Sequence, residues 1–249
     1  MGYGFDPIEA IKMVTINPAD YYGLRYLGAI APLRRADMLF LDDLKGVAVG
    51  KVMVDGRIVH EDGRFVGSSP PYVYPERLFA TVHPGRVTAA DFKIKAGKRK
   101  GPIRVVEIAN QTITREYRRE LAVRDGYLEK VVDDDIIPVA VVNRHRKRQA
   151  GKGFIKGTGI KDGALATTLI WDTGNLLTLG TDEEEMARCV NRLAEIGGGT
   201  VVSQRGAVLY ECALPVLGVL SVDSVVGLAA KTKGLGVAIH IGHDAKCIE

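Results

Sequence analysis

Cysteine is scarce in this sequence: its 249 residues include only Cys189, Cys212 and Cys247. The number is odd and no C-x-x-C pair occurs, which argues against a disulfide framework and against a cysteine zinc site. The start, MGYGFDPIEA, lacks the basic and apolar regions of a signal peptide. No uncharged apolar run reaches the roughly 18 residues that a transmembrane helix needs. We therefore expect a cytoplasmic protein that makes no membrane contact.

Aromatic residues and net charge are also low. Aromatics make up 6% of the chain, and 34 Lys and Arg against 30 Asp and Glu leave a net charge of +4. Two stretches are basic, residues 93–102 (KIKAGKRKGP) and residues 143–149 (NRHRKRQ). A dedicated nucleic-acid binder concentrates more positive charge and places aromatic residues among it. We therefore expect both stretches to be solvated loops and expect no nucleic-acid partner.

The common catalytic and phosphate-binding motifs are missing as well. The glycine-rich run at residues 151–159 fits neither a Walker A loop nor the G-x-G-x-x-G fingerprint, and G-x-S-x-G and H-E-x-x-H do not occur. His240 and His243 form only an isolated pair near the end of the chain, where order is usually poor. We expect no metal site in this chain, and we interpret the glycine-rich run as a connection between strands whose backbones pass closely.

Local patterns predict helices first and then a small sheet. Asp6 is placed to cap a helix that starts at Pro7, and Asn17 to cap a second one that starts at Pro18. A strand is expected over residues 38–41, and residues 47–66 are expected to form a meander with Asp-Gly turns at 55–56 and 62–63. Residues 67–102, rich in Pro, Ser, Gly and Lys, are expected to be a linker region.

From residue 103 the pattern predicts a second, α+β region. Strands are expected at residues 103–108, 120–132, 136–144, 164–170 and 175–181, and a hairpin around Arg205-Gly206. A helix is expected over residues 181–196, with Thr181 and Glu184 as a capping box and GGG at 197–199 as its end. Its apolar face consists of Met186, Cys189, Val190 and Leu193.

The motif WDTGN, residues 171–175, lies between two predicted strands. Asp172 and Asn175 are polar groups that can serve a site at a strand end. Taken alone, the motif is interpreted as a turn, because Asp, Thr, Gly and Asn are turn formers. The residues alone name no complete catalytic set and no substrate.

Two long stretches resemble the adenine deaminase branch of the amidohydrolase superfamily. Residues 5–44, FDPIEAIKMVTINPADYYGLRYLGAIAPLRRADMLFLDDL, resemble the end of that family's metal-dependent barrel and the return into its small β domain. Residues 141–202, from VVNRHRKRQAGKG to AEIGGGTVV, resemble its C-terminal domain, and Arg144 and His145 occupy the family's Arg-His positions. The glycine-rich run then becomes a structural connection inside that domain.

This sequence departs from the family pattern in three places. Leu33 stands where the family usually has glycine, in G-x-I-A-P-G-x-x-A-D. The family's H-D-x-H-N becomes Trp171-Asp172-Thr173-Gly174-Asn175, so both histidines are absent. The tail, residues 221–249, leaves the pattern altogether. The resemblance implies a catalytic barrel, of which only the last helices are found here, and no H-x-H motif is present anywhere.

The resemblance implies an α+β fold in four parts. Residues 1–30 are expected to be the barrel's C-terminal helices, and 31–75 a partial small β domain, the composite domain of amidohydrolases. Residues 76–102 are expected to be a linker region. Residues 103–249 are expected to be an adenine-deaminase-like C-terminal α+β domain, truncated at its end.

The resemblance also implies a function in adenine catabolism. The full enzyme hydrolyses adenine to hypoxanthine and ammonia with Mn or Fe divalent ions, which lower the pKa of a bridging water. The ligands for these ions are not present in this chain, so we expect it to be inactive alone. Its weak site candidates are His145, as a proton shuttle or orienting group, Asp172 and Asn175. The expected partners are adenine, once a barrel completes the site, and a homo-oligomer or a separate barrel chain.

Alternatives remain open at this stage. The chain can be a fragment, a decayed copy or half of a split enzyme. It can also be a non-catalytic module that binds purine or another chain, because the first predicted helix is amphipathic and has no barrel here to receive its apolar face. His145 can equally be a hydrogen-bonded histidine at a strand end with no chemical role.

Overall fold

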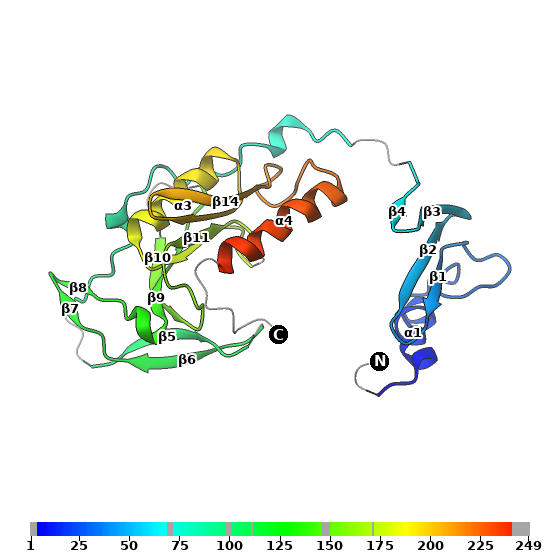
Figure 1. The fold of residues 1–249 in the computed structure, drawn as a ribbon, viewed down its shortest axis with the longest axis horizontal. Helices are drawn as coiled ribbons and strands as arrows, with labels where there is room; N and C mark the ends of the chain where they lie inside the picture. Colours follow the sequence, from blue (N-terminus) through cyan, green and yellow to red (C-terminus); the bar gives the residue numbers. More distant parts are fainter. Residues whose placement is uncertain are drawn as a thin grey trace. The chain divides into compact units, whose positions relative to one another are not determined.

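The computed structural model describes residues 4–68, 72–97, 101–110, 112–145, 150–170 and 172–240. The chain divides into two compact units, Met1–Val73 and Tyr74–Glu249 (Figure 1). Helices and strands occur in both units, as expected for an α+β fold. Within the described part of the chain, no helix is long and apolar enough to cross a membrane.

The first unit combines two short helices with a four-stranded antiparallel meander. The helices are α1 (Pro7–Val14) and α2 (Ile16–Tyr21), and the strands, in sheet order, are β1 (Met38–Asp43), β2 (Ala48–Val54), β3 (Arg57–Glu61) and β4 (Arg64–Phe65). Both predicted Asp-Gly turns are confirmed, because Asp55, Gly56, Asp62 and Gly63 all have positive φ.

The predicted start of α1 is confirmed, and that of α2 is wrong. Asp6 Oδ1 accepts hydrogen bonds from the backbone N–H groups of Ile8 and Glu9, at 2.9 and 3.2 Å. Thr15, not Asn17, is the N-cap of α2, so Asn17 lies inside the helix. The Thr15 hydroxyl makes no capping bond, because it donates instead to the carbonyl of Ile11 at the end of α1, at 2.7 Å. Thr15 is both the C-cap of α1 and the N-cap of α2, so no loop separates the two helices.

The first unit buries very little. Among its described residues, Ala19 alone is fully buried. Leu33 is fully exposed and has a φ of +66°, in the left-handed region that disfavours residues with a Cβ. In the family that this chain resembles, this position usually has glycine, which adopts such a φ without strain.

The second unit is built on an eight-stranded sheet in the order β14-β13-β11-β12-β9-β10-β5-β6. Neighbouring strands are antiparallel except β10 and β5, which are parallel. The strands are β5 (Ile103–Ile108), β6 (Thr114–Arg119), β9 (Ile136–Val142), β10 (Ala150–Lys156), β11 (Ala164–Thr167), β12 (Leu176–Gly180), β13 (Gly199–Gln204) and β14 (Ala207–Ala213). A separate small hairpin joins β7 (Val123–Arg124) to β8 (Tyr127–Leu128), so residues 120–132 are strand only in part.

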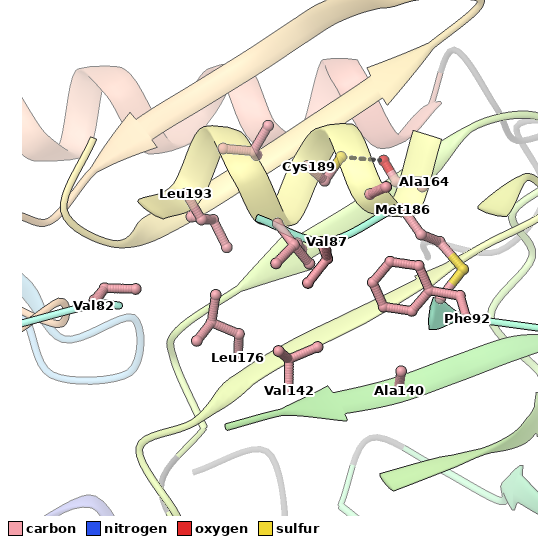
Figure 2. Packing of buried hydrophobic residues seen from close by; sticks show 14 residues of the cluster. Val82, Val87, Phe92, Ala140, Val142, Ala164, Leu176, Met186, Cys189 and Leu193 are labelled. Atoms are coloured by element: carbon pink, nitrogen blue, oxygen red, sulfur yellow. Dashed lines mark hydrogen bonds between the residues drawn. The ribbon is translucent and has the colours of Figure 1, made fainter. Parts of the chain in front are cut away.

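Two helices lie on this sheet. Helix α3 (Glu183–Glu195) packs on β11, β12 and β13, and helix α4 (Val225–His240) packs along β14. Figure 2 shows the core between α3 and the sheet, and every predicted apolar residue of α3 lies in it. Met186, Cys189, Val190 and Leu193 are all fully buried, so the 3.6-residue pattern identified the correct face.

The predicted cap of α3 is wrong by one residue. Asp182, not Thr181, is the N-cap, and its Oδ1 accepts from the backbone N–H groups of Glu184 and Glu185 at 2.8 and 3.0 Å. The hydroxyl of Thr181 is buried and is shared with the backbone of Gly163, which it contacts as acceptor at 3.0 Å and as donor at 3.2 Å. The local pattern assigned the Thr181 hydroxyl to the helix cap. In the structure this hydroxyl instead bonds to Gly163, just before β11.

Part of the stretch expected to be a linker contributes to this core. Val82, Val87 and Phe92 are buried in the cluster under α3 (Figure 2). Val87 is also held at both backbone groups by the side-chain amide of Asn191 on α3, at 2.9 and 3.0 Å. The contact-based boundary falls after Val73. The finer four-part division of the chain stays a prediction.

The glycine-rich run is a strand followed by turns, and not only a connection. Gly151 and Gly153 lie inside β10, where an added Cβ would meet no atom within 4 Å. Close backbone approach is found instead at Gly157, whose φ is +93° and whose added Cβ would lie 3.2 Å from the carbonyl oxygen of Ile108. The tip of the basic stretch, residues 146–149, lies outside the described residues.

The thiol of Cys189 lies at the centre of the core. Its Sγ is 3.4 Å from the carbonyl of Ala164 and 3.0 Å from the Ser203 hydroxyl (Figure 2). Burial raises the pKa of Cys189 to about 11, because the thiolate would be desolvated there. This thiol therefore acts as a small apolar group, with no nucleophilic role at neutral pH.

Replacing Leu33 by glycine should stabilise the first unit. Glycine adopts a positive φ without the steric cost of a Cβ, and its greater freedom in the unfolded chain offsets part of the gain. We expect Leu33→Gly to raise the free energy of unfolding by about 0.5–1 kcal/mol, measured by urea denaturation. Leu44→Gly is the matched control, since Leu44 is exposed but does not have a positive φ. A loss of stability in both variants would contradict this account of Leu33.

The buried thiol should make the second unit sensitive to alkali. The pKa of Cys189 is raised on folding, so its contribution is complete below the unfolded thiol pKa, near 8.5, and is lost as the pH rises towards 11. We expect a loss of roughly 2–3 kcal/mol across this interval. Urea denaturation at several pH values should show this loss in the native chain relative to Cys189→Ala. An identical pH dependence in the two proteins would refute the assignment.

Candidate functional site at the end of strand β9

Arg144 follows β9 and joins three distant segments through its side chain. Nη1 donates to the carbonyl of Gly174 at 2.9 Å, and Nη2 donates to the carbonyl of Leu217 at 2.8 Å. Thr81 accepts twice, at its carbonyl from Nε at 3.3 Å and at its hydroxyl from Nη2 at 2.9 Å. A planar fork of donors suits this task, because it serves several acceptors in fixed directions. We call this set of bonds the Arg144 clamp.

The backbone of Arg144 is held as well. Its N–H donates to Asn175 Oδ1 at 3.3 Å, and its carbonyl accepts from the N–H of His83 at 2.6 Å. Asn175 comes directly before β12, which pairs with β9. The end of one strand and the start of its neighbour are therefore fixed through side chain and main chain together.

All these partners of the Arg144 guanidinium are neutral. Among the described residues, no ion pair is formed by Arg144, whereas Arg192 on α3 pairs with Glu195 and Glu211 at 2.9 and 2.7 Å. Partial burial lowers the pKa of Arg144 below its usual value, because the guanidinium loses part of its hydration. An arginine remains charged under these conditions. Arg144 therefore places at this end of the sheet a positive charge that has no ion-pair partner among the described residues.

A cavity of about 580 Å³ lies beside the clamp. Five aliphatic side chains and three polar ones line it, together with Gly174: Leu169, Ile170, Leu217, Val219, Leu220, Thr81, Arg144 and His145. Its size and its mixture of apolar wall and few polar groups are typical of small-molecule sites.

The structure brings together two of the three candidate residues. His145 lines the cavity, and its backbone N–H donates to Asn143 Oδ1 at 2.9 Å. Asn175 is connected to the cavity through Arg144, whose backbone N–H donates to Asn175 Oδ1. Asp172 lies exposed in the turn between β11 and β12 and is not among the residues that line the cavity, while Trp171 lies outside the described residues. The chemical roles of His145, Asp172 and Asn175 stay predictions.

Sequence reasoning missed the polar groups that complete this arrangement. Arg144 was noted only as part of the family's Arg-His pair, and Thr81 comes from the stretch expected to be a linker. Leu217 and Leu220 come from the segment after β14. A local pattern contains no signal for these residues, because their meeting depends on the pairing of strands far apart in sequence.

A divalent metal has no evident ligand set here. In the ranges that the structure describes, no three His, Cys, Asp or Glu side chains group closely enough to hold a metal ion. The pair His240 and His243 is not part of that test, because residues 241–249 lie outside the described ranges. We therefore derive no chemical step through a metal from the residues of this structure.

Replacing Arg144 by lysine should loosen the clamp. One ammonium group cannot serve Thr81, Gly174 and Leu217 with the same geometry, so several charge-assisted hydrogen bonds are lost. We expect the free energy of unfolding to fall by roughly 2–3 kcal/mol. Hydrogen exchange should also become faster at the amides of Gly174 and Leu217, which are bonded to the carbonyls of Ile170 and Leu78.

Arg205→Lys is the matched control for Arg144→Lys. Arg205 is exposed and pairs with the carboxylate of Asp162 at 2.9 Å, a surface interaction worth less than about 1 kcal/mol. Equal effects of the two substitutions on stability and on hydrogen exchange would show that the clamp does not hold these segments.

Comparison with known families gives a consistent result over nearly the whole chain. The profile of the adenine deaminase C-terminal domain matches residues 111–247, and that of the amidohydrolase family matches residues 1–59. The first range contains Arg144, His145, Asp172 and Asn175, whereas Thr81 lies between the two ranges.

The curated relatives of this chain include several adenine deaminases. The chain is 39% identical over 220 residues to adenine deaminase 1 of Carboxydothermus hydrogenoformans, covering 88% of this chain and 36% of that protein. It is 43% identical over 234 residues to the adenine deaminase of Moorella thermoacetica, covering 92% and 39%. It is 41% identical over 223 residues to an adenine deaminase of Clostridium botulinum, covering 88% and 37%.

The chain thus spans less than two fifths of the length of these three relatives. The match to the C-terminal domain covers more than half of the chain and includes the Arg144 clamp and its cavity, apart from Thr81. The chain therefore belongs to the adenine deaminase family, with the C-terminal domain of that family as its larger part.

Proposed function

We propose that this chain serves as the C-terminal part of an adenine deaminase and does not catalyse the reaction alone. The reaction adds water to adenine and releases ammonia, leaving hypoxanthine. The observation that carries the proposal is the identity of 39–43% to three adenine deaminases along 88–92% of this chain. The match to the amidohydrolase family at residues 1–59 supports it independently.

The proposed enzyme depends on divalent metal ions, which we take to be Mn or Fe. Such ions lower the pKa of a bound water and so generate a nucleophile at neutral pH. The sequence contains no H-x-H pair, and the described residues provide no ligand group. We therefore place the metal ligands on a barrel outside this sequence, supplied by a longer protein or by a separate chain.

Within this chain, the proposed contribution to the site is the end of β9. The Arg144 clamp fixes the position of His145 and, through the Arg144 backbone, that of Asn175. An imidazole at the rim of a cavity can orient a polar group of the substrate or shuttle a proton, because its two ring nitrogens can donate and accept. Asp172 is the weakest of the three candidates, since its turn is exposed.

A second candidate function is a module that binds purine or another chain without catalysis. The cavity of about 580 Å³ favours it, and so does α1, on which Ile8, Met13 and Val14 are exposed by 50, 51 and 76%. A separate barrel chain or a second copy of this chain would cover such a surface.

We place either form in the cytoplasm, because the cysteines of the described part, Cys189 and Cys212, are free thiols.

Adenine turnover tests the first function. The chain is assayed with Mn²⁺ alone, and then mixed with the separately expressed barrel domain of a homologous adenine deaminase, with that barrel alone as control. We expect hypoxanthine only in the mixture, and a lower rate when the chain carries His145→Ala. Turnover by the chain alone would refute its inactivity, and no turnover in the mixture would argue against a split enzyme.

The second function has its own measurement. Adenine should raise the melting temperature of the chain in the absence of any barrel. A strictly monomeric chain whose melting temperature does not respond to purines would exclude a purine-binding or partner-binding module.

A further inference from the structure

The cavity beside the Arg144 clamp is asymmetric in its chemistry. One part of its wall is aliphatic, formed by residues 169–170 and 217–220, and the polar part consists of Thr81, Arg144 and His145. No Asp or Glu is among the described residues that line it. A ligand that fits both parts has an apolar body and one polar edge, and the sign of the local charge determines which edge is favoured.

That local charge comes from Arg144. A guanidinium has five N–H groups, and the clamp uses one at Nε, one at Nη1 and two at Nη2. The second N–H of Nη1 has no partner among the described residues. A cation that loses hydration without meeting a carboxylate is stabilised when an acceptor or an anion approaches its remaining donor.

Two glycines lie against the guanidinium, and Gly218 leaves it the room that a larger residue would fill. A Cβ added to Gly218 would lie 2.8 Å from Arg144 Nη2 and 3.0 Å from Val82 Cγ2, and one added to Gly174 would lie 3.5 Å from Nη1. Both glycines have positive φ, +71° and +61°. The backbone therefore passes directly against the guanidinium, and the charge is held at the cavity wall instead of extending into solvent.

We propose that this cavity binds a flat heteroaromatic ring whose polar edge is anionic or rich in acceptors, with Arg144 as the residue that positions this edge. The aliphatic wall packs on the ring, and the remaining Nη1–H group and His145 face the edge. The choice of a purine-like ring rests on the proposed function. The preference for an anionic edge over a cationic one rests on the charge of the cavity alone.

A matched pair of probes tests the charge preference. Benzimidazole-5-carboxylate and 5-(aminomethyl)benzimidazole have the same ring and opposite charges, and adenine is the neutral reference. The affinities are measured by calorimetric titration of the chain at pH 8, where the Arg144 guanidinium is charged. We expect the carboxylate to bind at least tenfold more tightly than the amine, with adenine between them.

Variants locate the site. Arg144→Lys should weaken the binding of the carboxylate at least tenfold, whereas the exposed control Arg205→Lys should leave it unchanged. Leu220→Glu, which places a carboxylate on the cavity wall, should remove the preference for the anion. Circular dichroism checks that each variant is folded. If Arg144→Lys does not fold, the binding of the carboxylate is measured instead in two other variants. These are Thr81→Val, which removes one acceptor of the clamp, and Leu220→Glu.

Three results would overturn the proposal: equal affinity for the two charged probes, no binding of either at millimolar concentration, or unchanged binding in a folded Arg144→Lys variant. The titration contains neither a metal nor a barrel, so its result is separate from that of the turnover assay. Binding of the carboxylate without turnover in the mixture would argue against the split enzyme and leave this inference intact. Turnover without binding of any probe would refute this inference alone.

Discussion

A cation held by backbone carbonyls organises one end of the larger unit. Arg144 gathers acceptors from three segments that lie about 60, 30 and 70 residues away along the chain. Each of these carbonyls would otherwise need water or a strand partner. Hydrogen bonds from a charged donor are stronger than those between neutral groups. The Arg144 side chain can therefore replace the backbone hydrogen bonds between strands where the sheet ends. The cavity lies where Arg144 joins these segments, and its lining includes Thr81, Gly174 and Leu217.

The same end of the sheet depends on close contact between backbones. A Cβ on Gly198 would lie 2.5 Å from the Cα of Gly218, and one on Gly199 would lie 1.9 Å from the carbonyl oxygen of Cys212. The buried Thr168 hydroxyl donates to the carbonyl of Gly218 and accepts from the N–H of Gly199. The glycine triplet after α3 therefore does more than end a helix: it lets the start of β13 lie directly against β14 and the segment after β14, which also supplies Leu217 to the clamp.

Local chemistry was enough to predict much of this fold. The apolar face of α3 and the positive-φ turns at Asp55-Gly56, Asp62-Gly63 and Arg205-Gly206 follow from spacing and turn preference alone. The wrong predictions concern side chains that contact a segment distant in sequence instead of their neighbours in sequence. Thr181 serves Gly163 instead of the helix cap, and Thr81 and Val82 belong to the clamp and the core although their surroundings are rich in Pro and Gly. The candidate site was predicted only in part for the same reason, since Arg144 acts through non-local carbonyls.

The two units differ in what stabilises them. The second unit has a continuous core between α3 and the sheet, whereas Ala19 alone is fully buried among the described residues of the first. Two apolar side chains on β1, those of Leu39 and Phe40, remain exposed by 59 and 43%. A four-stranded meander gains stability by covering one apolar face, and its two short helices bury little of their own. The first unit, which buries so little, is also the part of the chain that the amidohydrolase family matches.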